Sequence, residues 1–181
     1  DRARYAAAHA RWLVAARPSL RRFRRALREP LAAQECALAR ILARTAGSEY
    51  GRRHGLAAVR SLRDYQERVP IVAPDLLAPD IASMLSGRPG VLTTEPVVAF
   101  ERTTGTTGGA RHVPYTPRLL EELSSALLPW MADTWLRDPA LLLGGAYWSV
   151  SPMAAARETT ASGVPIGFEE DVQYFGALGP A

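Results

Sequence analysis

A run of threonine and glycine from residue 103 to residue 109 has the composition of an anion-binding loop. Four threonines and three glycines occupy these seven positions. Because glycine lacks a Cβ atom, successive backbone N–H groups can turn inward and form a concavity for an anion. Threonine hydroxyls add donors that also accept hydrogen bonds. The run therefore predicts a phosphate-binding loop, with an ordinary surface turn as the alternative.

Neither of the two common nucleotide-binding motifs is present. A P-loop requires lysine, and all 22 basic residues of the chain are arginine. A dinucleotide fingerprint requires GxGxxG at the start of a helix, which this run does not provide. Arg102 and Arg111 flank the run, and arginine binds phosphate through its planar fork of donors. The two arginines are candidate phosphate ligands, with solvated loop charges as the alternative.

The elements that must position this run are two strands and a helix. Residues 97–100 are apolar and rich in valine, as a strand requires. Val113 precedes a proline, which disfavours helix, so residues 113–115 are predicted to be extended. Thr116 and Pro117 predict a helix start, with threonine as the N-cap and proline in the first turn. A loop at the end of a strand is a favoured ligand position in α/β proteins.

The first third of the chain is predicted to be helical. Pro18 and Pro30 are expected to interrupt it, because proline breaks a helix or begins a new one. Gly47 is expected to end the helical run. A short helix is then predicted up to residue 68, since Ser61 and Asp64 have the spacing of a capping box.

The later segments mix helix and strand. A helix over residues 75–85 is predicted to close at Gly87, and the helix that begins at Pro117 should reach about residue 137. Extended segments are predicted at 91–92, 140–143 and 146–150. Because helices and strands interleave after residue 90, the sequence favours an α/β fold preceded by a helical N-terminal region.

Composition limits the other classes of function. The 181 residues are 48% hydrophobic and 22% charged, which is typical of globular proteins. No apolar run is long enough to cross a bilayer, so we expect no membrane partner. The single cysteine, Cys36, excludes an internal disulfide, and we expect it on the apolar face of a helix. His9, His54 and His112 lack a metal-binding spacing, so we predict no metal ligands.

The first 30 residues form a basic segment. Nine arginines face two acids there, whereas the whole chain has a net charge of +4. An apolar stripe at helical spacing runs through this segment and consists of Leu20, Phe23, Leu27 and Leu31. The stripe predicts an amphipathic helical arm, residues 1–33, docked on a larger body. The charge also permits contact with nucleic acid or acidic lipid, but we do not expect nucleic acid as a partner.

Several segments together carry a resemblance to a known family. TTGTTGG followed by a basic residue and VPYT resembles the phosphate loop of acyl-adenylate-forming enzymes. More narrowly, it is similar to the auxin-responsive Gretchen Hagen family of acyl-acid amido synthetases, in its bacterial branch. The segments GSEYGRRHGL and SLRDYQERVPIV resemble the family's lead-in to the adenylating domain, and ETTASGVPIG resembles its later TPSGLP segment. The similarity covers a domain that we place at residues 34–181.

The resemblance implies an N-terminal adenylate-forming domain with a mixed sheet, and an activity. The family activates a small carboxylic acid with ATP to an acyl-adenylate and then transfers the acyl group to the amine of an amino acid. Mg²⁺ would shield the phosphate charge. The residues that would bind the ATP phosphates are Thr103, Thr104, Gly105, Thr106, Thr107, Gly108 and Arg111. No catalytic residue is assigned.

The resemblance also implies part of an acyl pocket. Leu127 and Trp130, on the helix after the loop, would approach the acid, with a core role as the alternative. Thr160 matches a family threonine near the acyl substrate, or else simply begins a turn. The family often has a lysine two or three residues after the double glycine, where this chain has Arg111 nearby. That substitution changes the detailed geometry of phosphate binding.

Two further expectations and two alternatives complete the interpretation. Because family members are longer, we expect the polypeptide to continue after residue 181, and we expect a cytoplasmic location. One alternative function is an adenylate-forming ligase that transfers to coenzyme A or another acceptor. The other is a non-catalytic helical or α/β binding module with a basic arm.

Overall fold

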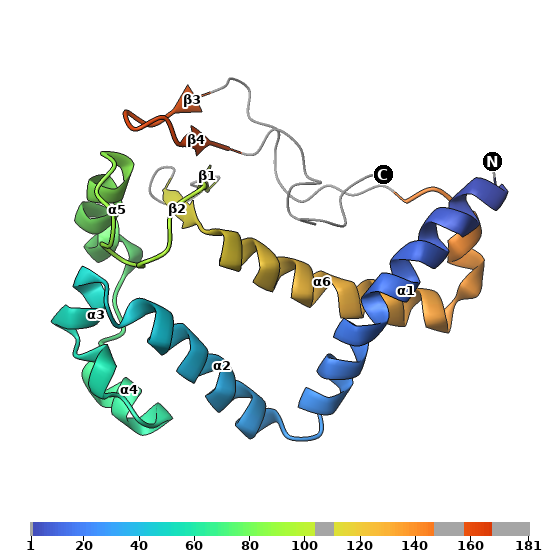
Figure 1. The fold of residues 1–181 in the computed structure, drawn as a ribbon, viewed down its shortest axis with the longest axis horizontal. Helices are drawn as coiled ribbons and strands as arrows, with labels where there is room; N and C mark the ends of the chain where they lie inside the picture. Colours follow the sequence, from blue (N-terminus) through green and yellow to red (C-terminus); the bar gives the residue numbers. More distant parts are fainter. Residues whose placement is uncertain (1, 104–110, 147–157, 168–181) are drawn as a thin grey trace. The chain divides into compact units, whose positions relative to one another are not determined.

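A computed structural model describes residues 2–103, 111–146 and 158–167 (Figure 1). The chain forms two compact units. The first, here named the helical unit, comprises residues 1–30, 118–153 and 169–181. The second, the sheet unit, comprises residues 31–117 and 154–168.

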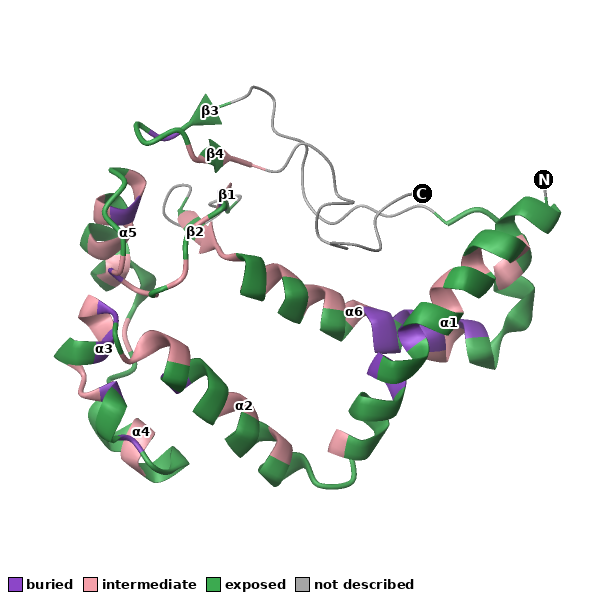
Figure 2. Cartoon of the chain, viewed as in Figure 1, coloured by how far each residue is buried: buried purple, intermediate pink, exposed green. Residues whose placement is uncertain are grey.

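The helical unit is built on two long helices, α1 (Arg2–Ala26) and α6 (Pro117–Arg137), followed by the 3₁₀ helix η3 (Pro139–Leu143). Its core joins Ala16 and Leu20 of α1 to Leu128 and Ala132 of α6. Figure 2 shows buried stretches of α1 and α6 in purple where the two helices meet. The start of α6 at Pro117 and its end near residue 137 confirm the sequence prediction.

Helix α1 continues through Pro18, so the predicted break there is wrong. A proline inside a helix costs about 3 kcal/mol because it removes one backbone hydrogen bond and crowds the preceding turn. The residues on either side of Pro18 offset this cost, since Ala16, Ser19 and Leu20 are all buried. Tertiary packing therefore overrides the local signal.

The apolar stripe predicted for the arm is buried only in part. Leu20 is 5% exposed, whereas Phe23, Leu27 and Leu31 are each at least half exposed. Helix α1 ends at Ala26, so Leu27 lies beyond it and Leu31 belongs to α2. An ion pair between Arg24 and Asp133, at 3.0 Å, adds a polar contact between α1 and α6.

The sheet unit begins with helices. They are α2 (Pro30–Thr45), α3 (Glu49–Arg53), η1 (Leu56–Ala58), α4 (Leu62–Arg68), η2 (Pro74–Leu77) and α5 (Ala78–Leu85). Pro30 begins α2 and Ser61 caps α4 by accepting a hydrogen bond from the amide of Asp64, as predicted. The helix predicted over residues 75–85 is present as η2 and α5, and Gly87 follows it with a φ of +93°.

Among the described residues, four short strands form one mixed sheet in the order β2-β1-β4-β3. They are β1 (Ala99–Arg102), β2 (His112–Tyr115), β3 (Glu158–Thr159) and β4 (Pro165–Ile166). Strand β1 is antiparallel to β2 and parallel to β4, and β3 is antiparallel to β4. Helices with a small mixed sheet confirm the predicted fold class.

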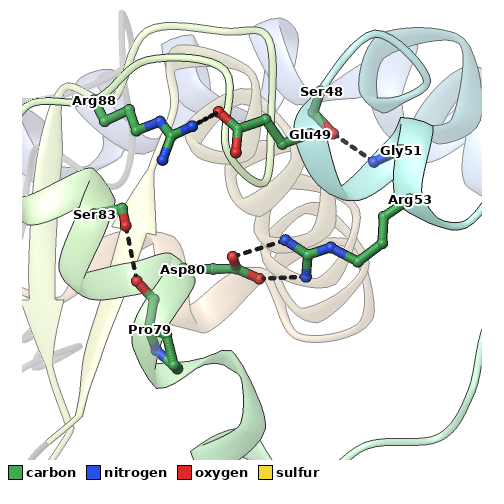
Figure 3. Close-up of polar contacts among 8 residues, drawn as sticks. All are labelled: Ser48, Glu49, Gly51, Arg53, Pro79, Asp80, Ser83 and Arg88. Carbon is green, nitrogen blue, oxygen red and sulfur yellow. Dashed lines mark hydrogen bonds and ion pairs between the residues drawn. The ribbon is translucent and has the colours of Figure 1, made fainter.

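Polar contacts join α3 to α5 and to the segment after it (Figure 3). The guanidinium of Arg53 faces the carboxylate of Asp80 and donates to both of its oxygens at 3.1 Å. Arg88 pairs with Glu49 at 2.9 Å. The hydrogen bond to Asp80 raises the pKa of Arg53 above its ordinary value.

Two predicted strands are wrong. Residues 91–92 are not a strand, because the carbonyls of Gly90 and Val91 accept hydrogen bonds from the first amides of α3. Residues 140–143 belong to η3, which Asp138 caps through the amide of Ala140. Of the segment 146–150, all but Ala146 lies outside the described residues. Cys36 lies on a helix as expected, α2, and its side chain is exposed.

Candidate functional site

Strands β1 and β2 bring the two ends of the threonine–glycine run together. The amide of Thr103 donates to the carbonyl of Arg111 at 2.9 Å, and the amide of Arg111 donates to Oγ1 of Thr103 at 3.1 Å. These two bonds continue the pairing of Arg102 with His112. Thr104, Gly105, Thr106, Thr107 and Gly108, which connect the strands, lie outside the described residues. The described part of the predicted loop is therefore the foot of a hairpin.

Both arginines that flank the run have carboxylate partners. Arg111 donates through Nε and Nη2 to Oδ1 of Asp75, at 3.1 and 3.0 Å. Arg102 donates through Nη1 to the two oxygens of Glu158, at 3.3 and 3.2 Å. Each acid is far from its arginine in the sequence, and neither was identified as a site residue from the sequence. For Asp75, the sequence predicted only a place at the start of a helix.

The sheet places Glu158 beside the hairpin. Because β1 and β4 are parallel, their carboxyl ends lie at the same edge of the sheet. Strand β3 runs antiparallel to β4, so it begins at that edge with Glu158. Beyond β4, the amide of Gly167 donates to the carbonyl of Phe100 at 2.6 Å. Two sequence-distant segments thus meet at the foot of the hairpin.

Thr160 occupies the turn that joins β3 to β4. Its Oγ1 accepts a hydrogen bond from the amide of Val164 at 3.0 Å and lies 2.9 Å from Oγ of Ser162. The residue is 9% exposed. The end of α5 supports this turn, since a Cβ atom on Gly87 would lie 2.9 Å from Cβ of Ser162. The contacts of Thr160 thus hold the turn together.

Leu127 and Trp130 lie on α6 and so belong to the helical unit. Leu127 is half-buried and packs against a cluster that contains Met131 and Trp135. Trp130 is 58% exposed, and its backbone carbonyl accepts a hydrogen bond from Thr134. The structure thus brings Thr103 and Arg111 together in the sheet unit. Leu127 and Trp130 lie in the helical unit.

A separate groove in the sheet unit contains none of the predicted site residues. It has a volume of about 770 Å³ and lies along α2, where Cys36, Leu42, Leu56 and Arg60 are among its lining residues. Across the described ranges, no three or more His, Cys, Asp or Glu side chains form a group that could hold a metal ion. No helix within those ranges is long and apolar enough to cross a membrane.

Solved structures with the same fold define the class of domain. The chain superposes on a structure described as AtGH3.15 acyl acid amido synthetase in complex with 2,4-DB, with a TM-score of 0.68 and 23% identity. The superposition covers 83% of this chain and 27% of that one. A second structure, GH3.15 acyl acid amido synthetase, gives the same TM-score at 22% identity over 83% of this chain and 28% of that one.

Residues 19–170 match the GH3 family N-terminal domain, and the chain therefore belongs to the GH3 family. Among its relatives is the probable indole-3-acetic acid-amido synthetase GH3.2 of Oryza sativa subsp. japonica, 36% identical over 107 residues. The indole-3-acetic acid-amido synthetase GH3.8 of Oryza sativa subsp. indica shows the same identity over the same length. Each alignment covers 55% of this chain and 17% of the relative. The family predicted from the sequence motifs is confirmed.

Proposed function

We propose that the protein carrying this chain is an ATP-dependent acyl-acid amido synthetase. It activates a small carboxylic acid to an acyl-adenylate with release of pyrophosphate, and then forms an amide with an amino acid. The observation that carries the proposal is the match of residues 19–170 to a family whose relatives are named as amido synthetases. Because the chain spans 17% of those relatives, the proposal concerns the whole protein.

The threonine–glycine loop is proposed to hold the ATP phosphates while the substrate carboxylate attacks the α-phosphorus. Donors fixed in advance and an in-line geometry supply most of the catalysis in such reactions. Thr103, Thr104, Gly105, Thr106, Thr107 and Gly108 would contribute amides and hydroxyls, and Arg111 a guanidinium. The hydrogen bonds between Thr103 and Arg111 support this role, because they fix both ends of the loop on paired strands.

The acyl group is proposed to contact Leu127, Trp130 and Thr160. The exposed indole of Trp130 offers an apolar surface to a small acid. Oγ1 of Thr160 already has two hydrogen-bond partners. Thr160 would therefore contact the acyl group through the turn that it holds together, and not through a mobile hydroxyl.

Magnesium is proposed to enter with the nucleotide, where it shields the phosphate charge. The described residues offer no cluster of acids to hold it, and Asp75 and Glu158 already accept hydrogen bonds from arginines. No step proposed here depends on a metal ligand from this chain. We further propose a cytoplasmic location, where ATP is available, and membership of the family's bacterial branch, on the resemblance of its motifs.

The test is acid-dependent exchange of pyrophosphate into ATP by the full-length protein. A panel of small carboxylic acids, indole-3-acetic acid among them, should contain at least one that supports exchange. Adding amino acids should then give an amide detectable by mass spectrometry. The absence of exchange with every acid would contradict the proposal, and a thioester with coenzyme A instead of an amide would contradict the acceptor.

The loop has a test of its own. Thr106→Ala combined with Thr107→Ala should lower the exchange rate at least tenfold, which corresponds to about 1.4 kcal/mol, because two phosphate donors are lost. Thr45→Ala is a suitable control, since that hydroxyl donates to the Ile41 carbonyl in the preceding turn of α2. Equal exchange rates for the double variant and the control would exclude a phosphate role for the loop.

A further inference from the structure

Arg111 is held at two points at the foot of the hairpin. Its amide donates to Oγ1 of Thr103 and its carbonyl accepts from the Thr103 amide, which fixes its backbone. Its side chain is fixed separately, because Nε and Nη2 converge on one oxygen of Asp75 at 3.1 and 3.0 Å. Asp75 comes from η2, a segment 36 positions earlier in the chain.

The contact with Asp75 leaves much of the guanidinium available. Arginine has five N–H donors, and Asp75 accepts from two of the three nitrogens through a single oxygen. Within the described ranges, Asp75 is the acceptor of the guanidinium hydrogen bonds. An anion can therefore bind Arg111 while the contact with Asp75 persists, because the remaining donors lie on the same rigid plane.

The pair contributes little to the stability of the fold. The side chains of Arg111 and Asp75 are 42% and 78% exposed, and exposed ion pairs have a small net effect because water competes for both charges. Its main physical effect is on the arginine, which otherwise samples many rotamers. A group fixed before its ligand arrives binds more tightly, because less ordering remains to be done.

We propose that Asp75 is a positioning residue that orients the Arg111 guanidinium for a nucleotide phosphate. This inference rests on the function proposed above and adds a residue that the sequence motifs do not identify. Asp75 does not itself touch the nucleotide. The carboxylate contacts the Nε–Nη2 edge of Arg111 and leaves the Nη1 donors available, in the manner of an outer-sphere partner that orients a ligand-binding group.

The experiment measures ATP affinity of the full-length protein by calorimetry, and the KM for ATP and kcat in pyrophosphate exchange. Asp75→Ala should weaken ATP binding and raise this KM by about fivefold, a loss that the rotamer freedom of arginine can explain, with little change in kcat. Asp75→Asn should recover part of the loss, because its amide oxygen still accepts from the guanidinium. Glu67→Gln, which removes an exposed ion pair with Arg63 on α4, is the matched control.

A double variant decides whether Asp75 acts through Arg111. If it does, Asp75→Ala with Arg111→Ala should be no weaker than Arg111→Ala alone, because the effects of coupled residues are not additive. If the fold losses of ATP affinity in the two single variants multiplied in the double variant, the two residues would act independently and the inference would be overturned. Tighter ATP binding by Asp75→Ala would also overturn it, since Asp75 would then compete with phosphate.

The two proposals fail in different ways. A protein that binds ATP but shows no acid-dependent exchange would contradict the proposed activity, while the binding measurements still decide the role of Asp75. A protein that exchanges pyrophosphate normally, with unchanged ATP affinity and KM in Asp75→Ala, would overturn the role of Asp75 alone. No ATP binding at all would overturn both. Thermal unfolding at the same temperature for all variants would confirm that the fold is intact.

Discussion

At the scale of single residues, Gly51 shows how closely the backbone packs around α3. A Cβ atom built on this glycine would lie 2.1 Å from the carbonyl oxygen of Thr45 and 2.7 Å from that of Ala46. Both are backbone atoms, so neither can move without displacing the end of α2. The amide of Gly51 also donates to Oγ of Ser48, which is fully buried and caps α3. Glycine is therefore required here for space.

Gly51→Ala should destabilise the sheet unit by about 3 kcal/mol or more, the upper range for overpacking a rigid site. The measurement is the midpoint of urea unfolding. Gly144→Ala provides the control, because a Cβ atom there would meet nothing within 4 Å and its φ of −110° suits any residue. Equal midpoints for the two variants would contradict the packing described for α3.

Asp133 should make the helical unit sensitive to acid. Hydrogen bonds from Arg24 and Arg137 lower the pKa of this carboxyl below its ordinary value of 3.8. Because the folded pKa is below the unfolded one, the stabilisation is present above about pH 3.8 and is lost as the pH falls through the folded value. The midpoint temperature of thermal unfolding should therefore fall less between pH 5 and pH 2 in Asp133→Asn than in the unsubstituted protein. Equal shifts would contradict it.

At the same scale, the sequence predicted one half of the candidate site and missed the other. Arg102 and Arg111 were recognisable because they flank an unusual run of threonine and glycine. Their partners, Asp75 and Glu158, were not recognisable, since each ion pair joins segments that are adjacent only after the chain has folded. Charge alone cannot reveal such pairs in a chain with 18 acids.

At the scale of elements, local chemistry predicted the ends of helices well. Ser61, Pro30 and Pro117 each begin or cap a helix as expected, because capping depends on residues that are close in sequence. The failures involve distant partners. Helix α1 passes through Pro18, and the carbonyl of Val91 bonds to α3 instead of a neighbouring strand. Neither feature can be predicted from the neighbouring residues in the sequence.

The packing of α1 on α6 predicts unequal roles for two leucines of the same stripe. Leu20→Ala should cost about 2–5 kcal/mol, as is usual for truncating a buried leucine. Leu27→Ala should cost less than about 0.5 kcal/mol, as is usual at exposed positions. The side chains are 5% and 61% exposed. The measurement is the free energy of unfolding by urea, and equal losses would mean that Leu27 is also packed against protein in solution.

At the scale of the molecule, the family was predictable from the sequence but its geometry was not. Several short segments in the expected order were enough to indicate the family, and the match over residues 19–170 agrees. The strand order of the mixed sheet required the structure, because β1 pairs with β2 nearby and with β4 much later in the chain. No local pattern predicts which distant strand occupies an open edge.

The pairing of β1 with β4 has a consequence for synthesis on the ribosome. Strand β2 follows β1 closely in the chain and can pair with one edge of β1 soon after its synthesis. Strand β4 is translated roughly 60 residues after β1. At about 5–20 residues per second, that edge waits for roughly 3 to 12 s. An uncovered edge strand invites pairing with other chains. The nascent polypeptide is therefore most exposed to aggregation, and to protection by a chaperone, during this interval.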